Sequence, residues 1–581
     1  MKKLKFLSVF AVIAGLLLMN SCSEEFLEIT PNGSLDQSVL ATYEGVDALV
    51  IGAYSLLDGI TGGFGWESAT SGWVYGSIRG MESNKGTDSG DQPDINPLQT
   101  YSETSTNPYL NIKWRAIYEG VSRCNSTIQT AALALDAGTI DAAEQASFVN
   151  QARALRGWYH LEAWRLWADK TTNTFVPYVD ETTIQADLVN TVDIRPMIVA
   201  DLQAGVDNLP EDMDQVGRFN KTVCQVFLAK AYMQMYGDYG SALTLLNAAA
   251  AGSNPAGQKA SLMANYGDIF DIEMRNDVES IYTVQYSVND GSGGRNGGWG
   301  EVLNFPYKSG TSPGGCCGFF NPTQDFVNSF RTDANGLPFL DNSYNDEKVT
   351  NDQGVALGGV YVEYPGQLDP RLDWSAGRRG IPYLDWGDHT GQDWIRDQTY
   401  SGPYSPKKQV YKQAQEGSYT EVGNWTSGYT ANGYRMIRYA DVLLLKAECE
   451  AMGDTDDLGF GEVNSLRARA AASLVYEADG TTPAANYVIN EYTVAPANSA
   501  EAMLRIKFER KLELGQEGHR YYDLQRWGDV QTELTRILAY EKTMEWGNAL
   551  YGTATIGSED VNFPIPQRQI DLANGNLTQN R

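Results

Sequence analysis

The sequence predicts a mainly α fold: a solenoid of tetratricopeptide-like helical hairpins that carries a large loop-rich irregular lobe. Apolar residues recur at the helical period in several long segments. Two further segments share one hairpin pattern, and the periodicity largely vanishes from about residue 291 to 430. These three observations together predict helical hairpins interrupted by an irregular insert.

Four segments of the N-terminal half show the helical spacing of apolar residues. They span residues 40–57, 112–135, 148–167 and 192–209, and Pro210 ends the last of them. We therefore expect four long helices before residue 210.

The hairpin pattern occurs at residues 228–232 (LAKAY) and again at 444–448 (LLKAE). Each copy is followed by a Gly-Asp pair, at Gly237 and Gly453, and by a second apolar segment. A small residue at the helix crossing, a glycine turn and a second helix are typical of a tetratricopeptide-like hairpin. Such hairpins bury their apolar faces only by stacking on one another.

The chain shows no long linker, so we expect one domain over residues 22–581. Its helical frame is predicted at about 35–285 and 431–581, with a loop-rich insert at about 286–430 that is dominated by Gly, Asn, Asp, Pro and Trp. A second loop-rich stretch covers residues 61–107. Long irregular segments in a compact protein are usually functional.

Residues 1–21 are predicted to be a lipoprotein signal peptide. Three lysines precede an apolar run at residues 6–19, which is too short to span a bilayer, and the run leads to Ser21-Cys22. Cleavage there would leave Cys22 as the lipidated first residue, and several acyl chains on one residue give stable anchoring. The alternative is an ordinary secretory signal with an incidental cysteine.

The formal net charge of −29 becomes −32 once the three signal lysines are removed. This charge argues against nucleic acid or anionic lipid as a partner, because both require basic patches. We expect membrane contact only through the lipid anchor. Cys124, Cys224 and Cys449 lie singly in apolar helical stretches and are predicted to be small buried hydrophobes.

The C-terminal third carries a specific resemblance. Residues 509–514 (ERKLEL), 517–520 (EGHR) and 523–529 (DLQRWGD), with 434–448 before them and 563–580 after them, resemble the signature of the SusD (RagB) family. The resemblance implies a helical fold whose irregular lobe binds a ligand without catalysis. The ligand is usually an oligosaccharide, and a peptide in one branch.

The same resemblance implies a partner and a location. The partner is a TonB-dependent, SusC-like outer-membrane barrel, over which the protein acts as a lid. Ser23-Glu24-Glu25 resembles a surface-export signal, which favours a lipid-anchored position on the outer membrane, exposed at the cell surface. The chain is therefore expected to capture glycans as nutrients and to deliver them to the transporter.

The resemblance implies that loops around residues 62–90 and 295–320 form the sugar site, where exposed aromatic rings can stack on sugar C–H faces. Trp73 and Trp299 are the predicted stacking platforms, and polar groups nearby would bind hydroxyls. The alternative for each residue is that it only closes a loop over the core. The candidate ligand-binding residues are Trp66, Trp73, Tyr75, Arg79, Asn84, Asp88, Trp299, Cys316, Cys317, Phe319, Phe320 and, as a weaker separate group, Arg379.

Cys316-Cys317 stands between Gly315 and Gly318. Disulfides persist outside the cytoplasm, and flanking glycines tolerate the backbone of the small ring that adjacent cysteines form. We predict a vicinal disulfide in the binding site, where the flat apolar ring could stack on a sugar.

No catalytic residue, metal ligand or cofactor is predicted. Glu509, Glu513 and Glu517 share a helix face and could imitate the carboxylate pair of a glycoside hydrolase, but neighbouring arginines would keep them ionised. Residues 454–459 faintly resemble a calcium loop without its final glutamate, so a structural calcium ion stays open. A hydrolase and a peptide-binding tetratricopeptide scaffold are the rival interpretations.

Overall fold

A computed structural model describes residues 37–59, 65–169, 171–184, 188–308, 310–423, 425–453 and 455–581. The predicted signal peptide and Cys22 lie outside the described residues. Among the described residues, no helix combines the length and the apolar character that crossing a membrane requires.

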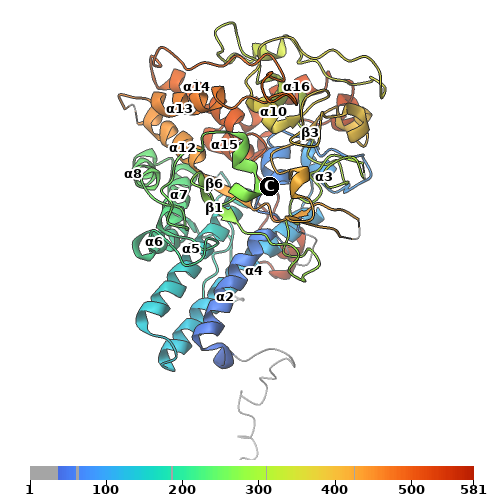
Figure 1. The fold of residues 1–581 in the computed structure, drawn as a ribbon. Coiled ribbons are helices and arrows are strands. Elements are labelled where there is room, and N and C mark those ends of the chain that lie inside the picture. Colours follow the sequence, from blue (N-terminus) through green and yellow to red (C-terminus); the bar gives the residue numbers. More distant parts are fainter. Residues whose placement is uncertain are drawn as a thin grey trace, which may run out of the picture.

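The predicted mainly α fold is confirmed (Figure 1). Each of the four segments predicted before residue 210 contains a helix, α2, α4, α5 or α6. The longer helices are α2 (Tyr43–Ser55), α4 (Pro108–Asp136), α5 (Ala142–Trp167), α6 (Arg195–Asn208), α7 (Lys221–Ala231), α8 (Tyr239–Ala250), α12 (Tyr439–Met452), α13 (Phe460–Ala471), α14 (Ser499–Glu513), α15 (Arg520–Trp527) and α16 (Val530–Glu541).

Local signals fix where these helices begin. The side chain of Asp141 accepts hydrogen bonds from the first turn of α5, and the side chain of Glu144 accepts one from the backbone N–H of Asp141. At α4 the side chain of Asn107 accepts a hydrogen bond from the N–H of Tyr109, and Pro108 follows, whose missing N–H costs nothing at that position. These caps explain why α4 and α5 start several residues before the apolar periodicity does.

The two predicted hairpins are present and are neighbours, because α8 lies against α12. Gly237 takes a left-handed conformation before α8, as a turn requires. In the second hairpin the left-handed residue is Gly459, whereas Gly453 has a negative φ. The left-handed turn predicted at Gly453 is therefore at Gly459, where an added Cβ would also lie 2.6 Å from the Cβ of Ala447.

The irregular lobe lies between two antiparallel strands, β1 (Ser280–Val284) and β6 (Tyr434–Arg438). Its chain covers the upper part and the right-hand side of Figure 1 in yellow-green to orange. In the described residues between the two strands, helices and strands reach five residues at most. They are α9 (Gln324–Asn328), α10 (Arg371–Ser375), α11 (Gln398–Ser401) and the strand pairs β2 (Ala376–Gly377) with β3 (Ser405–Pro406) and β4 (Thr420–Glu421) with β5 (Tyr429–Thr430).

The glutamates of the predicted acidic face form an ion-pair network in the interior: Glu509 and Glu513 lie on α14, and Glu517 follows its C-terminal end. Arg438 bonds to Glu513 at 2.7 Å and to Glu517 at 2.7 Å, while Arg371 bonds to Glu509 at 2.6 Å. Burial alone would raise the pKa of Glu513, but the arginines around it hold that pKa below its usual value. The structural interpretation of these glutamates is confirmed, because each of them is buried and paired with an arginine.

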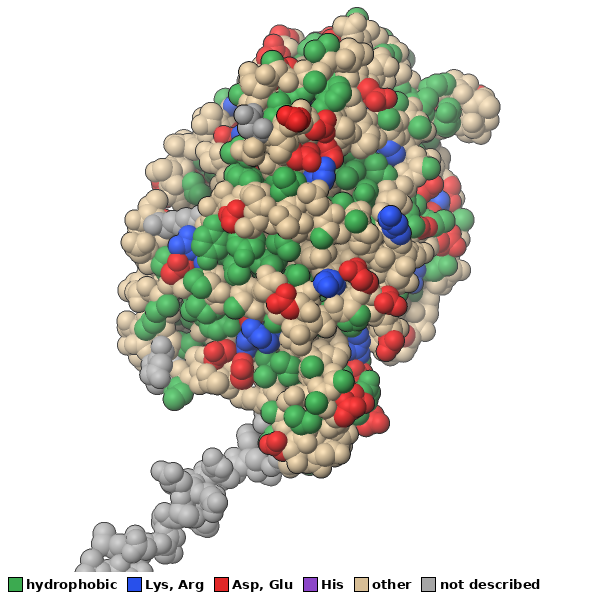
Figure 2. Space-filling view, turned by 90° about the vertical axis from the view of Figure 1, so that its left-hand side faces the viewer, with side chains coloured by type: hydrophobic (Ala, Val, Ile, Leu, Met, Phe, Trp, Pro, Cys, Tyr) green, Lys and Arg blue, Asp and Glu red, His purple; other side chains and the backbone are tan. Residues whose placement is uncertain are grey.

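The three single cysteines are buried free thiols, as predicted. Figure 2 shows one face of the molecule on which Lys and Arg side chains lie apart from one another, among acidic and uncharged ones. This face therefore offers no continuous basic patch to a polyanion.

Candidate functional site

Cys316 and Cys317 are joined in the predicted vicinal disulfide. Gly314, Gly315 and Gly318 around it all have left-handed backbone conformations, which residues with a Cβ adopt only at a cost. Cys317 is buried, whereas Cys316 is partly exposed and packs against the main hydrophobic core. The disulfide thus forms a small apolar surface that solvent can reach.

Four aromatic rings form a cluster close to this disulfide, which we call the aromatic cluster: Trp66, Trp299, Trp425 and Tyr429. Trp299 stacks on Tyr429 and on Trp66, with interplanar angles of 24° and 17°. Trp425 meets Trp66 and Tyr429 edge to face. Trp66 and Tyr429 are buried, Trp299 is partly exposed, and Trp425 is 43% exposed. Buried rings therefore support two rings that reach the surface.

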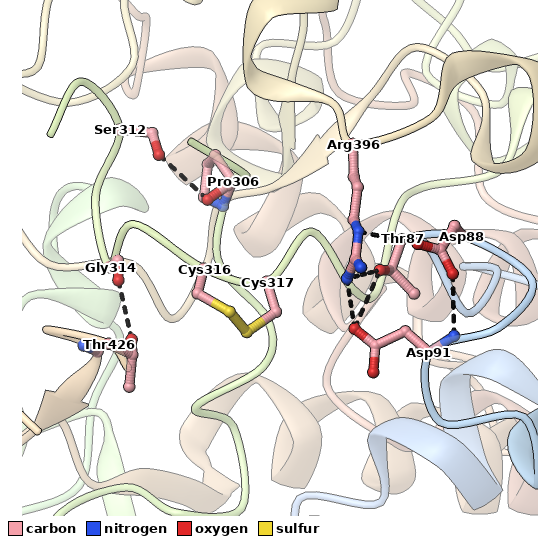
Figure 3. Close-up of a disulfide and its surroundings, with 11 residues drawn as sticks. Thr87, Asp88, Asp91, Pro306, Ser312, Gly314, Cys316, Cys317, Arg396 and Thr426 are labelled. Carbon is pink, nitrogen blue, oxygen red and sulfur yellow. Dashed lines mark hydrogen bonds and ion pairs between the residues drawn. A yellow bond between two sulfur atoms is a disulfide. The ribbon is translucent and has the colours of Figure 1, made fainter. Parts of the chain in front are cut away.

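Hydrogen bonds connect the aromatic cluster to the disulfide loop. The hydroxyl of Thr426 donates to the carbonyl of Gly314 at 2.8 Å, and the N–H of Ser427 donates to the same carbonyl at 3.2 Å (Figure 3). Trp425 therefore sits next to residues that are tied to the disulfide loop.

Polar groups lie beyond the other end of the disulfide (Figure 3). Arg396 pairs with Asp88 at 2.9 Å and with Asp91, and its guanidinium group lies 5.3 Å from the ring centre of Tyr307. The N–H of Thr87 donates to the carbonyl of Gly318, directly after the disulfide. We call Arg396, Asp88 and Asp91 the Arg396 cluster.

The side chains of the Arg396 cluster are about one-third exposed. Burial raises the pKa of Asp88, but hydrogen bonds from the backbone N–H groups of Gly90 and Asp91 and the charge of Arg396 together outweigh it and lower that pKa. Asp88 is therefore a carboxylate that accepts hydrogen bonds, and the cluster carries one positive and two negative charges.

One carboxyl group near the aromatic cluster has a raised pKa. Burial raises the pKa of Glu301 to about 7. Its side chain is enclosed, with the residue only 9% exposed, beside a small interior cavity of about 20 Å³. The raised pKa of Glu301 is therefore an effect of burial.

The faint calcium loop gives no clear site. Asp454 lies outside the described residues. Glu450, Asp457 and Glu462 could bring one oxygen each to a metal ion, but the amine of Lys446 already pairs with both glutamates. The amine of Lys446 therefore takes the place beside both glutamates that a metal ion would need.

The structure brings together five of the predicted site residues around the disulfide: Trp66, Asp88, Trp299, Cys316 and Cys317. It corrects the prediction for four aromatic residues, because their rings lie in the core. Trp73, only 2% exposed, packs edge to face on Phe319 and Phe320, and the hydroxyl of Tyr75 donates to the carbonyls of Glu67 and Tyr109.

Three polar candidates are also corrected. Arg79 is fully buried and pairs with Glu103 at 2.8 Å and with Asp560. The buried Asn84 bonds to the Ser401 carbonyl at 3.1 Å and to the N–H of Gly86 at 2.8 Å. Arg379 contacts the loop 352–361 through Asp352 and the Gly359 carbonyl, and its side chain is only 14% exposed.

Sequence reasoning missed Trp425, Tyr307 and Arg396. Trp425 lies between Gly423 and Gly428 in the irregular insert. An aromatic residue in a glycine-rich loop is the signal that selected Trp66 and Trp299, so the same signal could have found it. Arg396 has no comparable signal, because its partners are about 300 residues away in the chain.

Three comparisons relate this chain to known proteins. The SusD family model matches residues 278–581. A SusD-like protein of Bacteroides ovatus is 24% identical over 283 residues, which are 46% of this chain and 48% of that protein, so the match spans about half the length of this curated relative.

Solved structures share the fold over nearly the whole chain. Surface glycan-binding protein A from Bacteroides thetaiotaomicron, in complex with laminarihexaose, has a TM-score of 0.64 at 21% identity and covers 92% of this chain and 99% of its own. A SusD homolog from the same species has a TM-score of 0.65 at 19% identity, with coverage of 93% and 97%. At these identities the similarity demonstrates the fold.

Proposed function

Because this chain belongs to the SusD family, we propose that it is a cell-surface glycan-binding protein without enzymatic activity. It captures oligosaccharides at the aromatic cluster and the vicinal disulfide. It is held at the outer membrane by lipid on Cys22 and delivers its ligand to a TonB-dependent transporter.

The observation that carries the proposal is the exposure of Trp425 beside the partly exposed Trp299 and Cys316. Most large aromatic residues of the described chain are buried. Trp425, by contrast, is 43% exposed, and the buried rings of Trp66 and Tyr429 hold it edge to face, so its exposed ring can bind a ligand. Sugar rings present apolar C–H faces that stack on such surfaces. The Arg396 cluster supplies acceptors and donors for hydroxyl groups next to them.

The charges favour a neutral glycan. The cationic group of Arg396 is already paired with two carboxylates, and the chain as a whole is strongly acidic. The two carboxylates of the Arg396 cluster and the acidic chain around them would repel a uronic acid or sulfate group.

Affinity gels test the proposal. The protein without its signal peptide and anchor should be run through gels that contain neutral polysaccharides, laminarin included, and anionic polysaccharides. Laminarin belongs in the panel because one structurally similar protein is solved with laminarihexaose. We expect retention by at least one neutral glycan, loss of retention in Trp425→Ala, and no change in Trp374→Ala.

Trp374 is a suitable control because it is a partly buried tryptophan whose indole N–H donates to the carbonyl of Ser473. Its ring packs in two small hydrophobic clusters that hold none of the residues of the aromatic cluster. Retention by no glycan would contradict the proposal and favour the peptide ligand of the other family branch. Retention that Trp425→Ala leaves intact would place the site elsewhere.

Anchoring and delivery require tests in cells. A Cys22→Ala variant should leave the membrane fraction and should no longer support growth on the glycan that the wild type binds. Unchanged membrane association in Cys22→Ala would contradict the lipid anchor.

A further inference from the structure

A second cleft opens close to the aromatic cluster, between α2 and β1. Its volume is about 660 Å³, within the range of about 300–1,000 Å³ that small-molecule sites occupy. The end of α2, the loop 214–218 and residues 282–287 form its walls, and Asn296 closes one side.

One loop separates this cleft from the aromatic cluster. Asn296 lines the cleft, and Trp299 in the same loop belongs to the aromatic cluster. The loop is tightly held: the carbonyl of Asn296 accepts from the N–H of Ser287 at 2.8 Å, and the indole N–H of Trp299 donates to the carbonyl of Gly294 at 2.6 Å. A Cβ on Gly298 would lie 3.3 Å from the ring of Tyr286, so the absence of a side chain there keeps this wall thin.

The cleft is lined by tyrosine and carboxylate side chains, which are kinds of side chain that bind sugars. Tyr54, Tyr282 and Tyr286 lie along it, of which Tyr54 is partly exposed and the other two are buried, and Ile51 at its mouth is 47% exposed. Asp58 and Asp214 add carboxylates that can accept hydrogen bonds from hydroxyls. Arg218 is the cation among the lining residues, and it is already bound to Asp47 at 2.6 Å.

We infer that this cleft is a second subsite for the same glycan chain, which passes from the aromatic cluster over the loop 294–299 into the cleft. The inference rests on the proposed function. It adds that the ligand is a neutral oligosaccharide longer than the aromatic cluster can cover. Two linked contacts on one ligand act as an intramolecular pair, which raises affinity without any new contact at the first site.

Calorimetric titration with oligosaccharides of defined length, from disaccharide to octasaccharide, tests this inference. The series comes from laminarin and from every neutral polysaccharide that retains the protein in gels. We expect affinity to rise by about tenfold or more between the shortest chain that binds and the longest. Ile51→Arg, which places a bulky hydrated side chain over the mouth, and Asp214→Ala should remove most of that rise and leave binding of the shortest chain unchanged.

Leu133→Arg is the matched control, because Leu133 is 42% exposed on α4 and does not line the cleft. Hydrogen exchange adds a readout that does not depend on variants. The amides of residues 282–287 should gain protection with the octasaccharide and not with the shortest binding chain.

The outcomes separate this inference from the proposed function. Binding of short chains that Trp425→Ala abolishes, with no gain for longer chains or no effect of Ile51→Arg, would overturn the second subsite and leave the proposed function standing. Absence of binding to every glycan would overturn both.

Discussion

The rings of Trp299 and Tyr429 stack with centroids 5.0 Å apart and planes inclined by 24°. Tyr429 is buried, and the N–H of Trp299 is bound to a carbonyl, so the orientation of Trp299 is fixed before any ligand arrives. A preorganised ring loses little conformational entropy when a sugar stacks on it.

Replacing Trp299 with alanine should lower glycan affinity by about tenfold, which corresponds to about 1.4 kcal/mol, because both the partly exposed ring and its support of Trp425 through Tyr429 and Trp66 are lost. Titration calorimetry measures this change. Trp374→Ala should bind as the wild type does, and equal losses in both variants would point to a general effect on folding.

Trp73 should behave in the opposite way. Its ring lies in the core on Phe319 and Phe320, so Trp73→Ala should lower the free energy of unfolding by about 3–5 kcal/mol. Urea denaturation measures this loss, and the affinity of the fraction that remains folded should be close to that of the wild type. A variant with unchanged stability and abolished binding would return Trp73 to the binding site.

The helical frame could be predicted because its signals are local. The periodicity of α4 and α5 and the small residue at the crossing of α12 with α13 are visible within short windows of sequence. Even there, the choice of Gly459 over Gly453 for the left-handed turn depends on contact with Ala447 across the hairpin.

The site could be predicted only in part, because burial in irregular segments is not a local property. Arg79 stands in a loop-rich stretch like a surface residue, yet its partners Glu103 and Asp560 lie 24 and 481 positions away. Cys316-Cys317 was identifiable because the two cysteines are adjacent, and no distant partner had to be found.

The disulfide predicts a definite count of thiols. Without Cys22, the chain has five cysteines, of which Cys124, Cys224 and Cys449 are free. Alkylation under denaturing, non-reducing conditions should therefore add three labels, and alkylation after reduction should add five, as mass spectrometry would show. Five labels without reduction would contradict the disulfide.

Glu541 predicts a pH dependence of stability. Burial raises the pKa of its carboxyl group to about 8, whereas an unfolded glutamate titrates near its ordinary value of 4.5. The folded protein therefore holds a proton that the unfolded chain has released between these two values, so this group's contribution to stability is complete below about pH 4.5 and is lost as the pH rises to about 8.

Glu541→Gln should remove this contribution, because an amide oxygen can still accept the hydrogen bond that Glu541 takes from the N–H of Asp325 at 2.7 Å. The unfolding free energy of the wild type, relative to the variant, should fall by up to about 1.4 kcal/mol per pH unit across this window. Urea denaturation at several pH values measures the difference. A constant difference would show that Glu541 is ionised in the folded protein.

The central claim is that the aromatic cluster binds a neutral glycan and does not cleave it. Titration calorimetry of the wild type and of Trp425→Ala with the polysaccharide best retained in gels, followed by an assay for new reducing ends in the same samples, tests it most directly. We predict saturable binding by the wild type, an affinity about tenfold lower in Trp425→Ala, and no new reducing ends. Equal affinities for the two proteins, or reducing ends that accumulate with time, would contradict the account.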